Sequence, residues 1–311
     1  MSDSECILYQ DTYLRDKNIK LDRKIHEGSM STSFEGLHNV FSKKVFVKFI
    51  TIPWEESESI ELEVQALAQF REKKNIVYDA FYDSAINSQL IIVMEFIEGL
   101  SLDKMCGLEN ISIKQALNIT NNILYGLNEF HCQKLVHRDL KLENIVLKIN
   151  NPVIVDLGSV KQENSKVTKD DPISYLYRSP EVFCNSIYSV RSDLYQVGLI
   201  LFQLINGNLP NQVDFYAKMS NKPYTEDSKR TLAESQIRKL VIKNKLVDII
   251  ETNILYCSKL KRIVDKALSL KYPSIKSLYN DICRVIDKVP DWKRESSNVY
   301  SCRNWAKAIM F

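Results

Sequence analysis

The sequence lacks the features that mark membrane, nucleic-acid-binding or disulfide-rich proteins. It has no run of about eighteen apolar residues, and its polar N-terminus carries no signal-peptide pattern. The net charge is only +3 over 311 residues, too small to favour nucleic-acid binding by bulk electrostatics. Seven cysteines, an odd number without a CxxC pair, support neither a zinc site nor a disulfide framework. We therefore expect a soluble, cytoplasmic protein without a nucleic-acid or membrane partner, although a protein secreted into another cell would have the same composition.

Internal repeats and low-complexity tracts are also missing, which excludes a repeat array. Apolar residues make up 45% of the chain and charged residues 26%, as in ordinary folded proteins, so wholesale disorder is not expected. A chain of 311 residues can bury a large core and is predicted to divide into two lobes or domains.

One stretch concentrates chemically useful residues, since positions 137–144 read His-Arg-Asp-Leu-Lys-Leu-Glu-Asn. Asp139, Lys141 and Asn144 lie within six residues of one another. Asp156 follows after an apolar, β-branched run that predicts a buried strand. Two acidic groups and an amide, delivered by short strands and a loop, can hold divalent cations and orient a hydroxyl against a polyphosphate.

The first third of the chain has the pattern of a β-sheet. Residues 23–34 predict a strand, a turn and a second strand, and residues 45–50 predict a third strand. The apolar run 90–94 predicts a buried strand, which leads into a short connector over residues 95–99. Such a connector between two lobes is a natural hinge.

Helical patterns dominate the remainder. Apolar residues at three- and four-residue steps predict helices over residues 56–70, which carry Glu63, and over residues 113–131. Residues 192–205 begin with a capping-type Ser-Asp pair and are almost wholly apolar, which predicts a buried central helix.

These features together resemble the eukaryotic-type (Hanks-type) Ser/Thr protein kinase family over roughly residues 21–288. HRDLKLEN resembles the family's catalytic loop, and Asp156-Leu-Gly158 resembles its metal-binding triplet. Ser179-Pro-Glu181 stands where the family has Ala-Pro-Glu, and Lys48 occupies the place of the strand lysine. The order and separation of these motifs make the resemblance specific.

The resemblance implies an α+β, bilobal kinase fold. The expected divisions are an N-terminal extension over residues 1–20, a β-rich N-lobe over 21–97, a helical C-lobe over 98–289 and a C-terminal tail over 290–311. Trp305 lies in that tail, which could dock on its own lobe or recruit a partner.

The resemblance also implies ATP and Mg²⁺ as cofactors and assigns catalytic roles. Asp139 would accept the proton of the substrate hydroxyl, and Lys141 would neutralise charge on the transferred phosphoryl group. Asn144 and Asp156 would hold the magnesium ions.

On the nucleotide side, Lys48 would contact the phosphates while paired with Glu63. The nucleotide-binding positions that the resemblance implies are Lys48, Gly28, His26, Ser31, Ser33, Phe46, Met94, Glu95 and Ile97.

The nucleotide side departs from the family pattern. Of the three glycine positions in the phosphate loop, only Gly28 is a glycine, because His26 and Ser31 occupy the other two. Phe46 and Ser33 replace a usual alanine and valine, and Phe46 shares a strand face with Lys48. Either the large and small residues are exchanged and the pocket keeps its volume, or Phe46 closes it. We favour the exchange, because the polar catalytic groups are intact.

Two further positions concern the anchoring of the catalytic loop and of the Ser179-Pro-Glu181 segment. Asp193 resembles the aspartate that holds the catalytic-loop backbone in the family, and a helix N-cap would be compatible with that role. The family's late arginine, which pairs with the glutamate at the place of Glu181, is not evident. Lys271 is the nearest candidate, and a lysine would form a weaker pair than a bidentate arginine.

Control by phosphorylation is an open alternative. Arg138 precedes the catalytic aspartate, an arrangement that in the family often meets a phosphate on the activation loop. Candidate acceptors in or near that loop are Ser159, Ser165, Thr168 and Ser174. The other possibility is a charge-balanced loop whose lysines make it independent of phosphate.

The leading hypothesis is an ATP-dependent Ser/Thr protein kinase that phosphorylates protein hydroxyls, including its own. Lys141 and Ser174 resemble the Ser/Thr branch of the family rather than the tyrosine branch. The alternative is a pseudokinase scaffold with impaired nucleotide binding, and a small-molecule phosphotransferase is less favoured. The oligomeric state is not predicted.

Overall fold

The computed structural model describes residues 14, 16–27, 31–51, 81–86, 89–108, 111–157, 159–165, 174–207, 209 and 258–288. The chain divides into two compact units, Met1–Gly99 and Leu100–Phe311. Gly28, Glu63, Thr168, Trp305 and the predicted helix over residues 56–70 lie outside the described residues.

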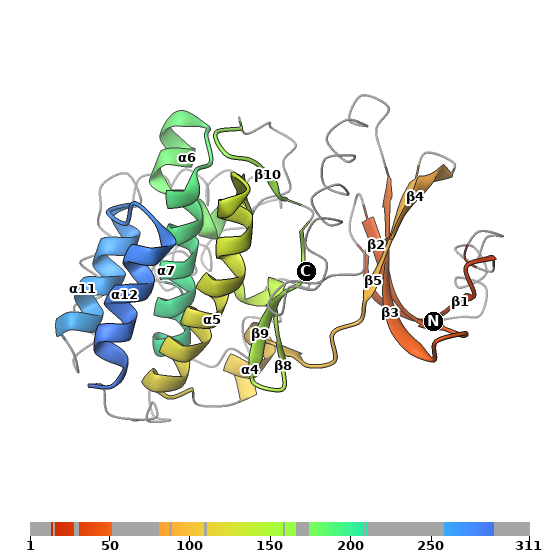
Figure 1. Ribbon diagram of the computed structural model, residues 1–311, viewed down its shortest axis with the longest axis horizontal. Helices are drawn as coiled ribbons and strands as arrows, with labels where there is room; N and C mark the ends of the chain where they lie inside the picture. Colours follow the sequence, from red (N-terminus) through yellow and green to blue (C-terminus); the bar gives the residue numbers. More distant parts are fainter. Residues whose placement is uncertain are drawn as a thin grey trace, which may run out of the picture. The chain divides into compact units, whose positions relative to one another are not determined.

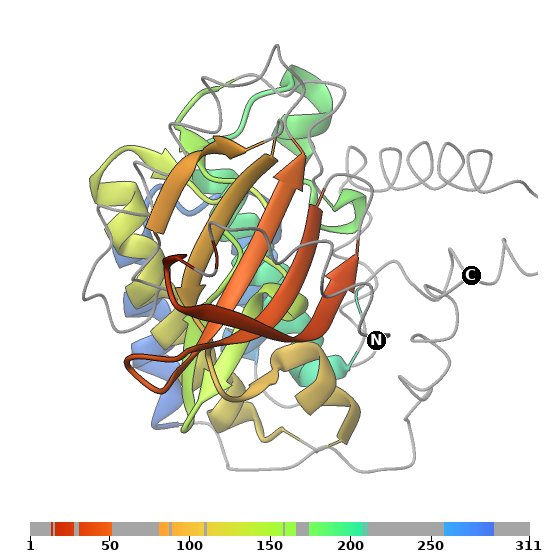
Figure 2. The same cartoon turned by 90° about the vertical axis from the view of Figure 1, so that its right-hand side faces the viewer.

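The first unit contains an antiparallel five-stranded sheet with the order β1-β2-β3-β5-β4 (Figure 2). The predicted strands over residues 23–34, 45–50 and 90–94 are confirmed, whereas β4 was not predicted. The strands are β1 (Ile19–Glu27), β2 (Ser31–His38), β3 (Lys43–Thr51), β4 (Phe81–Ile86) and β5 (Gln89–Glu95).

Strand β3 divides its side chains between the two faces of this sheet. Val45, Val47 and Phe49 are buried in one apolar core, where the Phe49 ring meets the Phe34 ring edge-on at 5.6 Å between centroids. Because neighbours in a strand alternate, Phe46 and Lys48 belong to the opposite face, and both are half-buried.

The second unit is built mainly of helices, which confirms the predicted α+β fold class. Figure 1 shows α5, α7, α11 and α12 side by side, with α6 beyond one end of α7. The helices are α4 (Leu102–Leu108), α5 (Ile113–Cys132), α6 (Pro180–Asn185), α7 (Val190–Asn206), α11 (Ser258–Leu268) and α12 (Ile275–Ile286). None of the helices within the described ranges has the length and hydropathy needed to cross a membrane.

Short strands and turns complete the described part of this unit. Two small antiparallel sheets have the orders β6-β8-β9 and β10-β7. The strands are β6 (Leu100–Ser101), β7 (Leu135–Val136), β8 (Ile145–Lys148), β9 (Asn151–Ile154) and β10 (Lys161–Gln162), with 3₁₀ turns η2 (Leu142–Asn144) and η3 (Tyr175–Tyr177).

Helix α7 is the predicted central helix, but it begins earlier than the sequence suggested. Its N-cap is Ser189, whose hydroxyl accepts a hydrogen bond from the Arg191 N–H at 3.1 Å. Ser192, predicted to begin the helix, is instead the third helical residue, and Asp193 lies in the first turn. The helix ends at Asn206, and its C-cap Gly207 adopts a left-handed conformation with φ of 80°.

A glycine in α7 allows α11 to approach closely. A Cβ atom added at Gly198 would lie 2.7 Å from Ala267 Cβ. Gly198→Ala should therefore lower the free energy of unfolding by about 1–3 kcal/mol, despite the better helix propensity of alanine. Urea denaturation measures this change. The double variant Gly198→Ala/Ala267→Gly should recover most of the loss, whereas equal stability of the single variant and wild type would contradict the close packing.

Candidate catalytic site

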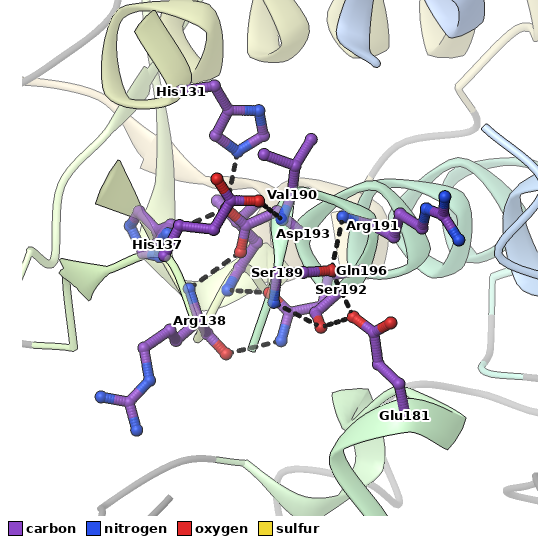
Figure 3. Close-up of polar contacts among 12 residues, drawn as sticks. His131, His137, Arg138, Glu181, Ser189, Val190, Arg191, Ser192, Asp193 and Gln196 are labelled. Carbon is purple, nitrogen blue, oxygen red and sulfur yellow. Dashed lines mark hydrogen bonds and ion pairs between the residues drawn. The ribbon is translucent and has the colours of Figure 1, made fainter. Parts of the chain in front are cut away.

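The stretch from His137 to Asn144 connects β7 to β8, and side chains of α7 anchor it. The Asp193 side chain is fully buried, and its two oxygens accept the backbone N–H groups of His137 and Arg138, each at 2.9 Å (Figure 3). His131 Nε2 lies 2.8 Å from Asp193 Oδ2. Asp193 therefore acts as an anchor for the loop backbone rather than as a helix cap.

Gln196 provides a second anchor that the sequence reasoning missed. Its Oε1 accepts the Leu140 N–H at 2.9 Å, and its Nε2 donates to the Arg138 carbonyl at 2.6 Å. Residues three apart on a helix share a face, so the position of Gln196 after Asp193 was an available signal.

These anchors also hold an unusual backbone conformation. Arg138 has a φ of 74°, in the left-handed region that non-glycine residues seldom adopt. The Arg138 guanidinium lies over the Tyr188 ring, 4.9 Å from its centroid, and the Arg138 residue is fully buried.

Asp139 is the centre of the polar contacts in the loop. Its side chain is nearly buried, and Oδ2 accepts Lys141 Nζ at 2.8 Å and Asn144 Nδ2 at 3.2 Å. Its Oδ1 accepts the backbone N–H of Ser174 at 3.0 Å. The structure thus brings Asp139, Lys141 and Asn144 together, and Ser174 reaches Asp139 through its backbone nitrogen.

The electrostatics of the loop favour a charged lysine. Burial acts to lower the pKa of Lys141, but the charge of Asp139 and the hydrogen bond to it outweigh burial and raise that pKa above its ordinary value. Asp156 contributes in the same direction, so its carboxylate charge acts on the same group. A Lys141 side chain held in its charged form can neutralise a nearby anionic group.

Asn144 and Asp156 lie at the same end of the β8–β9 hairpin. Ile145 pairs with Ile154, and beyond this pair Val155 N donates to the Asn144 carbonyl at 3.0 Å. The Asn144 side-chain NH₂ also donates to the Asp139 carbonyl at 2.9 Å, which leaves Asn144 Oδ1 as the amide oxygen for a ligand. An amide oxygen with a nearby carboxylate is a donor set that fits Mg²⁺.

In the first unit, the strand register gathers several predicted nucleotide-binding residues on one sheet face. Ser33 pairs with both His26 and Lys48, and Phe46 pairs with Met94. Residues directly opposite in antiparallel strands project to the same face. Ser33 and Met94 are buried, and Phe46 is half-buried between these strands.

Of the remaining predicted nucleotide-binding residues, Ser31 shares this face, whereas Glu95 pairs with Val45 and therefore belongs to the opposite face. Ser31 is two residues from Ser33 on β2 and therefore projects to the same side. Glu95 is the last residue of β5, opposite Val45, and Ile97 lies in the connector that follows. Glu95 and Ile97 are both half-buried.

The predicted contact between Lys271 and Glu181 is wrong. Lys271 is exposed, and no ion pair joins it to Glu181 within the described part of the chain. Glu181 Oε1 instead accepts hydrogen bonds from the Ser189 hydroxyl at 2.5 Å and from the Ser192 hydroxyl. The reason is local, because the early start of α7 brings both serines to the first turn of α6.

The His137 imidazole is a buried group that should make stability depend on pH. Burial lowers its pKa below the ordinary value, although the charges of Asp193, Asp139 and Asp156 oppose this effect. Below about pH 6.5, His137 therefore binds a proton in the unfolded chain but stays neutral in the folded chain. The free energy of unfolding should fall as the pH drops below about 6.5, by up to about 1.4 kcal/mol per pH unit.

The matched variant for this prediction is His137→Phe. Within the described part of the chain, neither ring nitrogen of His137 has a hydrogen-bond partner. The ring already packs edge-on against Phe130, so phenylalanine should fit the same space. Urea denaturation between pH 5 and 8 should show a flatter profile for the variant. An unchanged profile would assign the pH dependence to other groups.

This chain is similar to known proteins. The family model described as "Protein kinase domain" matches residues 19–283. A MAP kinase kinase of Saccharomyces cerevisiae is 30% identical over 251 residues, covering 78% of this chain and 47% of the relative. A Dictyostelium discoideum protein whose name places it with the cyclin-dependent serine/threonine-protein kinases is 32% identical over 197 residues, covering 60% and 28%.

A bacterial protein is also similar to this chain. A serine/threonine-protein kinase of Myxococcus xanthus is 29% identical over 226 residues, covering 67% of this chain and 41% of the relative. The chain thus spans less than half the length of each of these curated relatives.

Proposed function

We propose that this chain, which belongs to the protein kinase family, is an ATP-dependent Ser/Thr protein kinase that transfers the γ-phosphoryl group to protein hydroxyls. The observation that carries the proposal is the contact set of Asp139, whose carboxylate meets Lys141 at 2.8 Å and Asn144 at 3.2 Å. The proposed base thus contacts both a cation and the NH₂ group of an amide whose oxygen can serve a metal ion, and these are parts that phosphoryl transfer requires.

Each of these residues has a distinct part in the proposed reaction. Asp139 orients the substrate hydroxyl and accepts its proton as the oxygen attacks. Lys141 neutralises the negative charge that spreads over the transferred group. Asn144 and Asp156 would hold the metal ion, and bound magnesium-ATP supplies the phosphoryl group. Because Asp193 and Gln196 fix the loop backbone, little reorganisation is needed at the moment of reaction.

On the nucleotide side, Lys48 would contact the ATP phosphates from the sheet face that it shares with Ser33 and Phe46. The small, buried Ser33 lies one strand away from the bulky Phe46, which supports an exchange of large and small residues over the adenine. The pseudokinase alternative has less support, since a scaffold released from catalysis would not need the contacts of Asp139.

The substrates that we propose are protein serine and threonine residues, including residues of this chain. The relatives named for Ser/Thr kinase activity support this substrate class. We also propose autophosphorylation within residues 159–174, and the contact of Ser174 N with Asp139 supports it, because this contact places the last residue of that range beside the proposed base.

A radiolabel transfer assay tests the proposal. The chain is incubated with magnesium and γ-labelled ATP, in parallel with a generic protein, with small alcohols and alone. We expect label on protein serine and threonine, with less on the alcohols. A thermal shift with magnesium-ATP, run beside it, separates two failures: a shift without transfer would contradict catalysis, and no shift at millimolar ATP would favour the pseudokinase.

A further inference from the structure

Glu181 is held by hydroxyl groups at a position where the family resemblance leads one to expect a cation. It lies in the first turn of α6 and is half-buried. Its Oε1 accepts both the Ser189 hydroxyl, at 2.5 Å, and the Ser192 hydroxyl, as Figure 3 shows. Both serines belong to the N-terminal end of α7.

In their other contacts the two serine hydroxyls act as hydrogen-bond acceptors, so the hydroxyl proton of each is available for Glu181. A serine hydroxyl has one proton and two lone pairs. Ser192 Oγ already accepts the Ser189 N–H at 3.1 Å and lies 3.3 Å from the Ser179 hydroxyl, which donates to it. Ser189 Oγ already accepts the Arg191 N–H. Each hydroxyl is therefore placed to donate its proton to the carboxylate, and hydrogen bonds to a charged acceptor are the stronger kind.

The same helix also holds the segment that precedes Glu181. The Tyr177 hydroxyl donates to Gln203 Oε1 at 2.6 Å, and Gln203 lies on α7. Ser174, three residues before Tyr177, donates its backbone N–H to Asp139 Oδ1 at 3.0 Å. Residues 174–181 are thus bound to α7 and its N-cap through Tyr177, Ser179 and Glu181, while Ser174 contacts the proposed base.

Ser192 and Asp193 are consecutive residues that connect α7 to two different segments. Ser192 holds Glu181, and Asp193 holds the backbone of the catalytic loop. A displacement of α6 relative to α7 would therefore change where Ser174 meets Asp139.

We propose that Ser189 and Ser192 act as a hydroxyl clamp on Glu181, which replaces the arginine pairing of the family and positions residues 174–181 against Asp139. The clamp makes this segment independent of Lys271, which is exposed. Ser189 and Ser192 are positioning residues, since they act through Glu181 and touch no reacting atom. The effect on catalysis rests on the proposed kinase function, whereas the effect on the segment does not.

Replacing Ser189 by asparagine or by aspartate, two side chains of nearly the same shape, distinguishes the effect of the clamp from the effect of helix capping. Asparagine and aspartate cap helices about as well as serine, so both should preserve the bond to the Arg191 N–H. Asparagine retains N–H groups that can donate to Glu181. Aspartate has none when ionised, and it places a second negative charge beside Glu181. A purely structural cap would tolerate both variants equally.

We expect Ser189→Asn to remain within a few-fold of wild type and Ser189→Asp to lower kcat for a protein substrate by about 10- to 100-fold, the cost of misplacing a catalytic group by about 1 Å. The KM for magnesium-ATP should be unchanged in both. Lys271→Ala, the control for the alternative partner, should have wild-type activity. Equal kcat for the two Ser189 variants, or a loss in Lys271→Ala, would overturn the clamp.

Hydrogen exchange by mass spectrometry gives a second readout that needs no transfer activity. Peptides covering residues 174–185 should exchange faster in Ser189→Asp than in Ser189→Asn, with no change in peptides from α12. If wild type transfers no phosphoryl group but this difference is observed, the kinase proposal fails and the clamp stands. If exchange in residues 174–185 is the same in both variants, the clamp fails.

Discussion

Asp139→Asn should reduce phosphoryl transfer to protein by about 10²- to 10⁴-fold, the usual contribution of a general base. An amide oxygen cannot take up the substrate proton. Lys141 would also lose its carboxylate partner at 2.8 Å, and either orientation of the asparagine would set its NH₂ against a donor, because Lys141, Asn144 and Ser174 N all donate to Asp139. Initial rates of transfer to a generic protein measure the effect.

Nucleotide binding provides the internal control for this variant. Because Asp139 is not among the residues proposed to hold nucleotide or metal, the thermal shift with magnesium-ATP should be retained. Asp287→Asn, the same substitution at an exposed position beyond α12, should leave transfer unchanged. Transfer by Asp139→Asn at a rate near that of wild type would show that another group is the base.

Asp193→Asn should damage both stability and activity. Each oxygen of Asp193 accepts a backbone N–H of the catalytic loop, and Oδ2 also lies 2.8 Å from His131 Nε2. Asparagine offers one oxygen, so its NH₂ must face at least one buried donor. An unsatisfied buried donor costs about 1–3 kcal/mol in free energy of unfolding. A shift of the loop by about 1 Å can cost a further 10²-fold in rate.

Urea denaturation and initial rates separate these two effects, and Asp287→Asn again serves as the exposed control. We expect Asp193→Asn to remain less active than wild type without urea and at low temperature, where the variant is fully folded. Wild-type activity in a folded Asp193→Asn protein would mean that Gln196 alone, through Leu140 N and the Arg138 carbonyl, keeps the loop in place.

The predictions that came from periodicity succeeded because they depend on local patterns. Helix α5 follows from its apolar steps, and β3 and β5 follow from their β-branched runs. Strand β4 (Phe81–Ile86) was missed because its sequence, FYDSAI, has little alternation, and its pairing with β5 supplies what the local pattern lacks.

The errors at α6 and α7 have a different origin. The start of α7 was placed at Ser192, since a Ser-Asp pair is a common N-terminal signal, but Ser189 competes for the same role and forms the capping box. The family resemblance implies a cation beside Glu181 and therefore favours a distant lysine as its partner. Which donors reach a carboxylate depends on where two helices meet, and no sequence pattern records that.

The sequence by itself determined the chemistry of the loop, because Asp139, Lys141 and Asn144 lie within six residues and a short loop must keep them close. It also determined that Phe46 and Lys48 share a strand face, since alternation is a property of the backbone. Only the tertiary structure decided what holds these groups. Asp193, Gln196 and the serine clamp act over 8 to 58 positions, and contacts of that range depend on the packing of α7 against the loop and α6.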